Sequence, residues 1–237
     1  ATLTYSIVTS GTDPTSVDHD LFDVAAGGVL TFVSAPDFED PKCGAGNDAN
    51  ECVVVIKVTD GEVGTADDTI TVTVTVQDVN DEDPVFTSSA TKTLEENIQN
   101  VMVLTAEDDD ALDTVSFQIT GGDDRELFEI DGATQLRFKA NAVPNFESST
   151  AAGNGQEYVV VVTASDGADP ANTAIQTITV TITDANEDAP EFTGGDTATA
   201  NAAENQQAVG TYGAEDDDGT ATLTYSIVTS GTDPTSV

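Results

Sequence analysis

Alternation between apolar and polar residues marks several stretches of the chain as half-buried β-strands. Residues 69–76 place Ile70 and three valines on one face and threonines on the other, and residues 177–183 repeat the pattern. A period of two in β-branched residues is typical of a strand with one buried face. Residues 53–58 and 158–162 are more continuously apolar, as expected of central strands in a sandwich. No segment keeps a helical period, so the pattern predicts an all-β chain.

The same pattern predicts a series of short strands separated by Gly, Asp and Asn. In the middle of the chain they are expected at 84–94, 100–107, 114–120, 126–130, 135–140, 157–164 and 174–183. Seven short strands in about 100 residues are typical of a Greek-key, immunoglobulin-like β-sandwich. We therefore expect seven-stranded sandwiches.

The chain also repeats itself on two scales. Residues 1–17 recur without change at 221–237, which sets a repeat of 220 residues. Inside that repeat, the stretches 78–84, 96–97 and 106–110 are echoed at 184–190, 204–205 and 214–218. Internal repeats indicate modules in tandem. We therefore expect a window from a longer array, with the C-terminal part of one module at 1–83, a complete module at 84–189 and the N-terminal part of the next at 190–237.

Composition narrows the class of partner. The chain has 44 acidic residues against six basic ones, a net charge of −38. Nucleic-acid binding by a basic face is excluded, because phosphate contacts need Lys and Arg, and anionic membrane surfaces are disfavoured. No apolar run is long enough to span a bilayer. So large an acidic excess needs cations, either bound at specific sites or present as concentrated salt.

The two cysteines, Cys43 and Cys52, stand nine positions apart in a Gly- and Asn-rich stretch. Metal binding by thiolates would need more Cys or His nearby, and His19 is the only histidine. A local disulfide that closes a short loop is the preferred interpretation, with two free thiols as the alternative. A disulfide would place the chain outside the reducing cytosol.

Carboxylates concentrate at predicted strand ends, which lie at the poles of a sandwich. The clusters are Glu95–Asn97, Asp108–Asp110, Asn145–Glu147, Asp166–Gly167 and Asp184–Asp188. Carboxylates crowded at one pole repel one another by an amount that a cation can offset. Calcium fits best, since it takes six to eight oxygens from Asp, Glu, Asn and backbone carbonyls. A single acidic run is usually a solvated turn, so the argument depends on clusters that recur in register in both modules.

As a set, these motifs resemble the cadherin repeat family, in its bacterial or cadherin-like form, over essentially the whole chain. The motifs are Glu96-Asn97, Asp108-x-Asp110, Phe128–Ile130, Asp37–Glu39, Asp60 and Asp166 before glycine, and the linkers at 78–84 and 184–190. The resemblance implies tandem sandwiches joined end to end. It also implies calcium in each junction, held by the preceding module, the linker and the following module.

For the first junction, the resemblance implies side-chain ligands together with the carbonyls of Val79 and Glu82. The side chains are Asp37, Glu39, Asp78, Asn80, Asp81, Asp108, Asp110 and Asp166. For the second junction it implies the carbonyls of Ala185 and Asp188. The side chains there are Glu96, Asn145, Glu147, Asp184, Asn186, Glu187, Asp216 and Asp218. Asp60 is assigned to a preceding junction, and Glu204 shows which glutamate the first junction would take from sequence before residue 1.

Two residues depart from the family pattern. Asn145 and Glu187 stand where the family has Asp. The second junction therefore keeps one fewer formal charge, and we expect its outermost calcium to be weaker or absent.

The leading hypothesis is an extracellular, calcium-stiffened rod of tandem repeats that acts as a stalk, adhesin or filament and associates with neighbouring repeats. The alternative is a carbohydrate-binding or targeting module of a secreted or surface protein, which would need exposed aromatic residues over a groove. The chain has no Trp, and most of its four Tyr and nine Phe fall at core-like positions. An enzyme is disfavoured, because no nucleophile pattern surrounds His19, which is expected to be a solvated loop residue.

Overall fold

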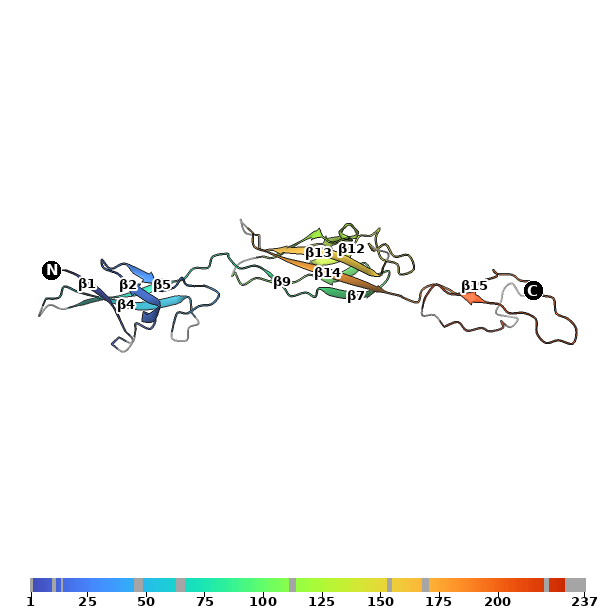
Figure 1. Cartoon of the computed structure of the whole chain (residues 1–237), viewed down its shortest axis with the longest axis horizontal. Coiled ribbons are helices and arrows are strands. Elements are labelled where there is room, and N and C mark those ends of the chain that lie inside the picture. The colour runs from blue at the N-terminus through green and yellow to red at the C-terminus, as the bar shows by residue number, and fades with distance from the viewer. Residues whose placement is uncertain are drawn as a thin grey trace. The chain divides into compact units, whose positions relative to one another are not determined.

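The computed structural model describes residues 2–9, 12–13, 15–44, 49–62, 67–110, 114–152, 155–167, 171–219 and 222–228. Their regular structure is β-strand apart from two single-turn 3₁₀ helices (Figure 1), which confirms the all-β prediction. The chain divides into two compact units. Unit 1 comprises Ala1–Pro84, Asp108–Thr114 and Asp166–Asn172, and unit 2 comprises Val85–Glu107, Val115–Ser165 and Thr173–Val237. The module boundaries expected from the repeats stay a prediction.

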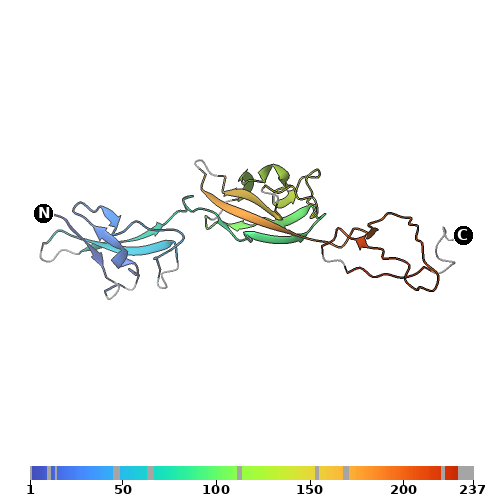
Figure 2. The same cartoon turned by 45° about the vertical axis from the view of Figure 1, so that its right-hand side comes forward.

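Unit 2 contains a sandwich of two main sheets. The first has the order β10-β13-β14-β7, formed by Ser116–Gly121, Glu157–Ser165, Thr173–Thr183 and Thr91–Glu95. The second has the order β11-β12-β8, formed by Phe128–Asp131, Gln135–Phe138 and Asn100–Val103. All pairs are antiparallel except β14 with β7, seen as the long orange and the green strand in Figure 2. The 3₁₀ helix η2 (Arg125–Leu127) leads into β11.

Two of the expected strands are each divided in the structure. The segment expected at 84–94 forms β6 (Val85–Phe86) and β7, and the segment at 100–107 forms β8 and β9 (Ala106–Glu107). β6 pairs with β9, whereas β7 and β8 pair with β14 and β12. Each segment therefore changes partner part-way. A period of two does not mark this change, because both halves remain extended.

The core of unit 2 lies between its sheets and comes from alternate residues of the long strands. Its fully buried members include Leu104, Leu136, Phe138, Tyr158, Val160, Val162, Ile178 and Val180. The Phe138 ring packs edge-on against Tyr158, with centroids 5.2 Å apart. Burying each large apolar side chain contributes about 1.5–3 kcal/mol, so this layer is the main source of stability.

Unit 1 repeats part of this architecture. Its sheets are β1-β4-β5, formed by Thr4–Val8, Glu51–Thr59 and Asp68–Thr75, and β2-β3, formed by Phe22–Val24 and Leu30–Phe32. The 3₁₀ helix η1 (His19–Leu21) precedes β2 as η2 precedes β11. Its buried core is smaller and centres on Phe22, Cys43, Cys52 and Val54.

The C-terminal segment, 190–219 with 222–228, carries only a short ladder among its described residues. β15 (Glu191–Phe192) pairs with β16 (Ala214–Glu215) in the register of β6 with β9. Most of its other described residues are exposed and lie outside strands. The repeat therefore preserves this local pairing in the C-terminal segment.

The expected disulfide between Cys43 and Cys52 is present, with Cα atoms 4.7 Å apart, and both residues are buried. In unit 2 the matching positions hold Ala151 and Tyr158. The Tyr158 hydroxyl accepts a hydrogen bond from Thr150 N at 3.2 Å. A large aromatic side chain thus occupies in unit 2 the place that the disulfide occupies in unit 1.

We expect the pair Cys43→Ala and Cys52→Ala to lower the free energy of unfolding of unit 1 by about 2–3 kcal/mol, because the bond closes a short loop. Denaturant unfolding of the variant measures the loss, and alkylation without reductant confirms that the wild-type thiols are paired. A variant as stable as the wild type would contradict this role.

Candidate metal centre

The acidic site of unit 1 combines side chains from three separate segments. Glu39, Asp81 and Asp110 place one carboxylate oxygen each within 4.8 Å of one another. Glu39 lies in the turn after β3, Asp81 lies after β5, and Asp110 lies in the loop after β9. The fold therefore brings together three of the residues singled out from sequence.

The loop of the Asp108-x-Asp110 motif is fixed by its own hydrogen bonds. Asp110 N donates to Asp108 Oδ1 at 3.1 Å, and Asp110 Oδ2 accepts from Glu82 N at 3.0 Å. Asp110 is only 5% exposed. The remaining oxygens Asp108 Oδ2, Asp110 Oδ1 and Glu39 Oε1 are buried and have no hydrogen-bond partner in the structure. A buried polar atom without a partner is costly, so these oxygens are suited to bind a ligand.

The other predicted ligands of the first junction surround this site or support its turns. Asp166 is buried and accepts from Asn172 N at 3.1 and 3.2 Å, and Asn172 Nδ2 donates to Asn80 Oδ1 at 3.0 Å. Asp37 Oδ1 accepts from the N–H groups of the next turn, at 3.1 and 3.0 Å. Asp78 raises the pKa of Glu39 by repulsion, after the larger effect of burial. Asp60 binds Glu62 N in another loop.

The acidic site of unit 2 is formed by Glu96, Glu147 and Asp184, whose carboxylate oxygens also lie within 4.8 Å of one another. Glu96 is 2% exposed and accepts hydrogen bonds from Phe146 N at 2.8 Å and Ala185 N at 3.0 Å. Asp184 Oδ1 is buried without a hydrogen-bond partner. Glu96 thus links the acidic turn before β13 to the residues that follow β14.

The second Asp-x-Asp motif repeats the geometry of the first. Asp218 N donates to Asp216 Oδ1 at 3.0 Å, and Asp218 Oδ2 accepts from Asp188 N at 2.9 Å. Asp218 is 2% exposed, and its Oδ1 is buried without a hydrogen-bond partner. Because two copies fold in the same way, the motif itself fixes this loop.

The residues that depart from the family pattern make local contacts. Glu187 accepts from Asn97 Nδ2 at 2.6 Å, whereas its counterpart Asp81 belongs to the three-carboxylate group of unit 1. Asn145 Oδ1 accepts from Ser148 N at 2.6 Å, so it caps its turn as Asp37 does. Asn186 and Glu204 are exposed.

Crowding also changes the protonation of these sites. Burial raises the pKa of Glu39 and Asp108 in unit 1 and of Asp188 in unit 2, and neighbouring carboxylates raise each pKa further. For Asp108, the hydrogen bond from Asp110 N opposes part of this rise. In the absence of a cation, these three carboxyls therefore hold their protons to a higher pH in the folded chain than in the unfolded chain.

In buffer free of divalent cations, we expect the free energy of unfolding to fall as pH rises above the ordinary carboxyl pKa values of 3.8 and 4.5. In that window the folded chain retains protons on Glu39, Asp108 and Asp188 that the unfolded chain releases, so a rise in pH favours unfolding. The lowered pKa values of Asp13 and Asp67 act below pH 3.8, outside the window. Denaturant unfolding at a series of pH values tests this, and stability that rises toward neutrality would contradict it.

One amide in each unit was not singled out from sequence, yet it holds the acidic turn. Asn50 Nδ2 donates to Phe38 O at 2.9 Å, and Asn50 O accepts from Val76 N at 2.8 Å. Gln156 makes the matching two hydrogen bonds in unit 2, at 2.6 and 2.8 Å. Each residue ties an acidic turn to the strand end that leads into the acidic linker. The available signal was a polar amide at the same repeat position.

Two buried aspartates were likewise missed as supports of the fold. Asp124 accepts from Ala152 N at 2.6 Å and Val159 N at 2.7 Å, and Asp18 makes the matching two bonds in unit 1, at 2.7 and 2.6 Å.

The expectation of a solvated His19 is wrong. Its side chain is 18% exposed, and its Nδ1 lies 3.0 Å from Ser16 O.

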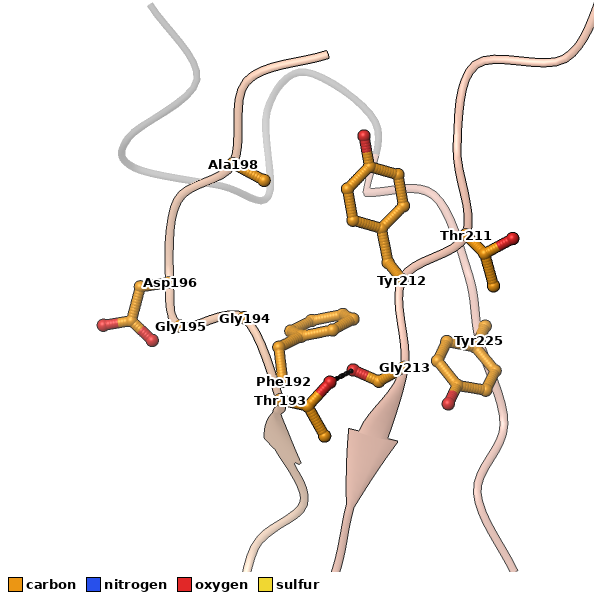
Figure 3. A pocket seen from close by; sticks show the side chains of 10 residues that line it. All are labelled: Phe192, Thr193, Gly194, Gly195, Asp196, Ala198, Thr211, Tyr212, Gly213 and Tyr225. Atoms are coloured by element: carbon orange, nitrogen blue, oxygen red, sulfur yellow. Dashed lines mark hydrogen bonds between the residues drawn. The ribbon is translucent and has the colours of Figure 1, made fainter.

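A cavity of about 400 Å³ in the C-terminal segment is lined in part by aromatic rings (Figure 3). Phe192 and Tyr225 have ring centroids 6.5 Å apart, and Tyr212 lies on the same cavity. The matching rings of the sandwich, Phe86 and Phe117, are 5.7 Å apart and pack against its core. Phe192 and Tyr225 therefore stand at repeat positions that belong to the core in unit 2, which does not support a carbohydrate-binding groove.

Comparisons with known proteins give a consistent set of relatives. No family model matches the chain. The chain is 26% identical over 202 residues to human Protocadherin Fat 1, across 82% of the chain and 4% of that protein. It is 36% identical over 126 residues to human Cadherin EGF LAG seven-pass G-type receptor 1, across 51% of the chain and 4% of that protein. The chain thus spans a small part of either relative.

Solved structures show the same fold. The Protocadherin gammaB7 EC3-6 cis-dimer structure matches with a TM-score of 0.64 and 21% identity, over 92% of this chain and 51% of that one. The Protocadherin GammaB4 extracellular domain matches with a TM-score of 0.59 and 24% identity, over 92% of this chain and 32% of that one. In the part of the chain that the structure describes, no helix has the length and hydropathy to cross a membrane.

Proposed function

We propose that the chain consists of cadherin-type repeats and is an extracellular segment that binds calcium at its two acidic sites. Bound ions would tie each acidic linker to the repeat before it and the repeat after it. The function is structural and adhesive rather than catalytic. A stalk or filament of many such repeats is the finer form of this proposal.

The observation that carries the proposal is the set of buried carboxylate oxygens without hydrogen-bond partners. They occur at Asp110 in unit 1 and at its counterpart Asp218 in unit 2, and further ones lie beside each. Most buried side-chain oxygens in folded proteins have a hydrogen-bond partner, so carboxylate oxygens left unpaired at matching positions of the repeat favour a ligand. Here each Asp-x-Asp loop uses one oxygen of its second aspartate for a backbone hydrogen bond and leaves the other for a ligand.

The donor set fits calcium. In unit 1 the ion would be held by Glu39, Asp81, Asp108 and Asp110, and in unit 2 by side chains grouped around Glu96. All are carboxylates, which are hard oxygen ligands, and no described His or Cys lies in either group. Calcium accepts more oxygen ligands and looser geometry than magnesium. When bound, it supplies the positive charge that offsets repulsion among these groups.

The rest of the proposal concerns stiffness. The residues 78–83 and 184–189 lack strand structure, so each linker is a hinge unless its ends are held. Asn50 and Gln156 fix the acidic turns to the adjoining strand ends, and the Asp-x-Asp loops bind the backbone of Glu82 and Asp188. A cation shared by these groups would restrain the linker without any change in the sandwich.

Isothermal titration of the whole chain tests the proposal. We expect several calcium ions to bind and magnesium to bind more weakly. Asp110→Asn should weaken calcium binding at the unit 1 site, because it removes the charge of one ligand. The expected loss is on the order of tenfold in affinity, or about 1.4 kcal/mol. Asp109→Asn, at an exposed neighbour, removes the same formal charge and should leave that site nearly unchanged. Equal effects of the two variants, or equal binding of magnesium, would contradict a specific calcium site.

A further inference from the structure

The disulfide of unit 1 closes a loop that begins beside the acidic turn. Cys43 is four residues after Glu39, and Cys52 lies near the start of β4. Both cysteines are at most 3% exposed. Besides the covalent bond, Ala49 N donates to Cys43 O at 3.2 Å, which adds a backbone bridge between the two arms of the loop. The described part of the loop is therefore held at its base in two ways.

Asn50 connects this loop to both sides of the acidic site. It lies two residues before Cys52. Its Nδ2 donates to Phe38 O at 2.9 Å, and its backbone O accepts from Val76 N at 2.8 Å. Phe38 precedes the site carboxylate Glu39, and Val76 leads into the acidic linker. The position of Asn50 therefore fixes the acidic turn relative to the linker.

Asp18 restrains the base of the loop independently of the disulfide. Its Oδ1 accepts from Gly44 N at 2.7 Å and its Oδ2 accepts from Val53 N at 2.6 Å, so one carboxylate binds the residue after each cysteine. Asp18 is only 4% exposed. When the disulfide is broken, these hydrogen bonds and the β4–β5 ladder still hold the strands together. Loss of the bond should therefore loosen the loop and leave unit 1 folded.

Unit 2 makes the same connection without a covalent bond. Gln156 donates to Phe146 O at 2.6 Å and accepts from Ile182 N at 2.8 Å. Tyr158 stands in the place of Cys52 and is fully buried in the core. The amide that supports the acidic turn is thus placed by an aromatic side chain in unit 2 and by a disulfide in unit 1. Because unit 2 has no cysteine, it serves as an internal control for the redox state of unit 1.

We propose that the disulfide between Cys43 and Cys52 sets the calcium affinity of the unit 1 site, an inference that rests on the proposed function. While the bond is closed, Asn50 holds the acidic turn and the strand end in place, so calcium meets a site that is already ordered. With the bond open, binding must also order the loop, and this requirement lowers the affinity. The unit 2 site should keep its affinity in both states.

The change between the two states is a two-electron reduction. A thiolate of a small dithiol such as dithiothreitol attacks one sulfur to form a mixed disulfide, and its second thiol then releases the other cysteine. The protein gains two electrons and two protons as two thiols, and dithiothreitol becomes a cyclic disulfide. Because coupling between two equilibria is reciprocal, bound calcium must oppose this reduction by the factor by which the disulfide strengthens calcium binding.

Calcium titration of the full chain before and after reduction with dithiothreitol tests the proposal. The step that Asp110→Asn weakens identifies the unit 1 site, whose affinity should fall about fivefold on reduction. The pair Cys43→Ala and Cys52→Ala should show the same loss without reductant. Asn50→Ala should weaken this site and remove its response to dithiothreitol, because the amide connection is already broken. Gln156→Ala is the matched control, which should weaken the unit 2 site and leave the unit 1 site responsive.

Amide hydrogen exchange in chelator gives a readout that does not depend on calcium. Reduction should speed exchange at Val76 N, which donates to Asn50 O, and should leave exchange unchanged at Ile182 N, which donates to Gln156 O. Amides within β4 and β5 should keep their protection, because unit 1 stays folded. Loss of protection throughout these strands would mean unfolding of the unit and would overturn the proposal.

The remaining outcomes separate this inference from the proposed function. Unchanged exchange at Val76 N, or equal calcium affinity of the oxidised and reduced chain, would overturn the role of the disulfide and leave the calcium sites standing. A response to dithiothreitol that persists in Asn50→Ala would overturn the connection through that amide. A chain that binds no calcium in either redox state would overturn the proposed function together with the coupling that rests on it.

Discussion

Replacing Glu96 with alanine is expected to lower the free energy of unfolding of unit 2 by about 2–5 kcal/mol in calcium, because two partly buried N–H groups lose their charged acceptor. Those groups are Phe146 N and Ala185 N. The same change removes one of the three carboxylates at the site. Calcium should therefore stabilise the variant less than it stabilises the wild type.

The effect of Glu96→Ala should depend on the cation. With chelator, the variant relieves repulsion from Glu147 and Asp184, which offsets part of the lost hydrogen bonding. Denaturant unfolding in calcium and in chelator measures both losses. Glu95→Ala, at the exposed neighbour, should change stability little in either condition. An identical loss with and without calcium would mean that Glu96 is a structural cap and not a ligand.

The sequence predicted the strands well, because each strand carries its own period of two or its own apolar run. It did not predict that the segments at 84–94 and 100–107 divide between partners, since the partner depends on β12 and β14 elsewhere in the chain. The pattern of a strand also did not fix how deeply its apolar face is buried. Val74 and Val180 have the same local pattern, but only Val180 is fully buried.

The acidic sites show the same division between local and long-range information. The Asp-x-Asp loops were predictable, because their hydrogen bonds join residues of one short motif. The contact of Glu187 with Asn97 spans 90 positions and required the fold. Asn50 and Gln156 look like ordinary surface amides in sequence. Their role appears only when the acidic turn and the strand end lie on either side of them.

The second large effect on the free energy of unfolding is expected at the buried aspartates beside η1 and η2, Asp18 and Asp124. Asp124 is 3% exposed and accepts from Ala152 N at 2.6 Å and Val159 N at 2.7 Å, which join a loop to β13. Hydrogen bonds to a charged acceptor contribute about 1.5–3 kcal/mol each. We therefore expect Asp124→Ala to lower the free energy of unfolding of unit 2 by about 3–5 kcal/mol.

Asp124→Ala should lower the free energy of unfolding equally with calcium and with chelator, because Asp124 lies outside both acidic groups. In this it should differ from Glu96→Ala. Denaturant unfolding under the two conditions measures it. Asp123→Ala, at the exposed preceding residue, is the matched control and should change stability little. A loss that appears only in calcium would place Asp124 in the metal site, and a loss as small as that of the control would show that its two hydrogen bonds are replaceable. Asp18 makes the same pair of bonds in unit 1, so Asp18→Ala should destabilise that unit in the same cation-independent way.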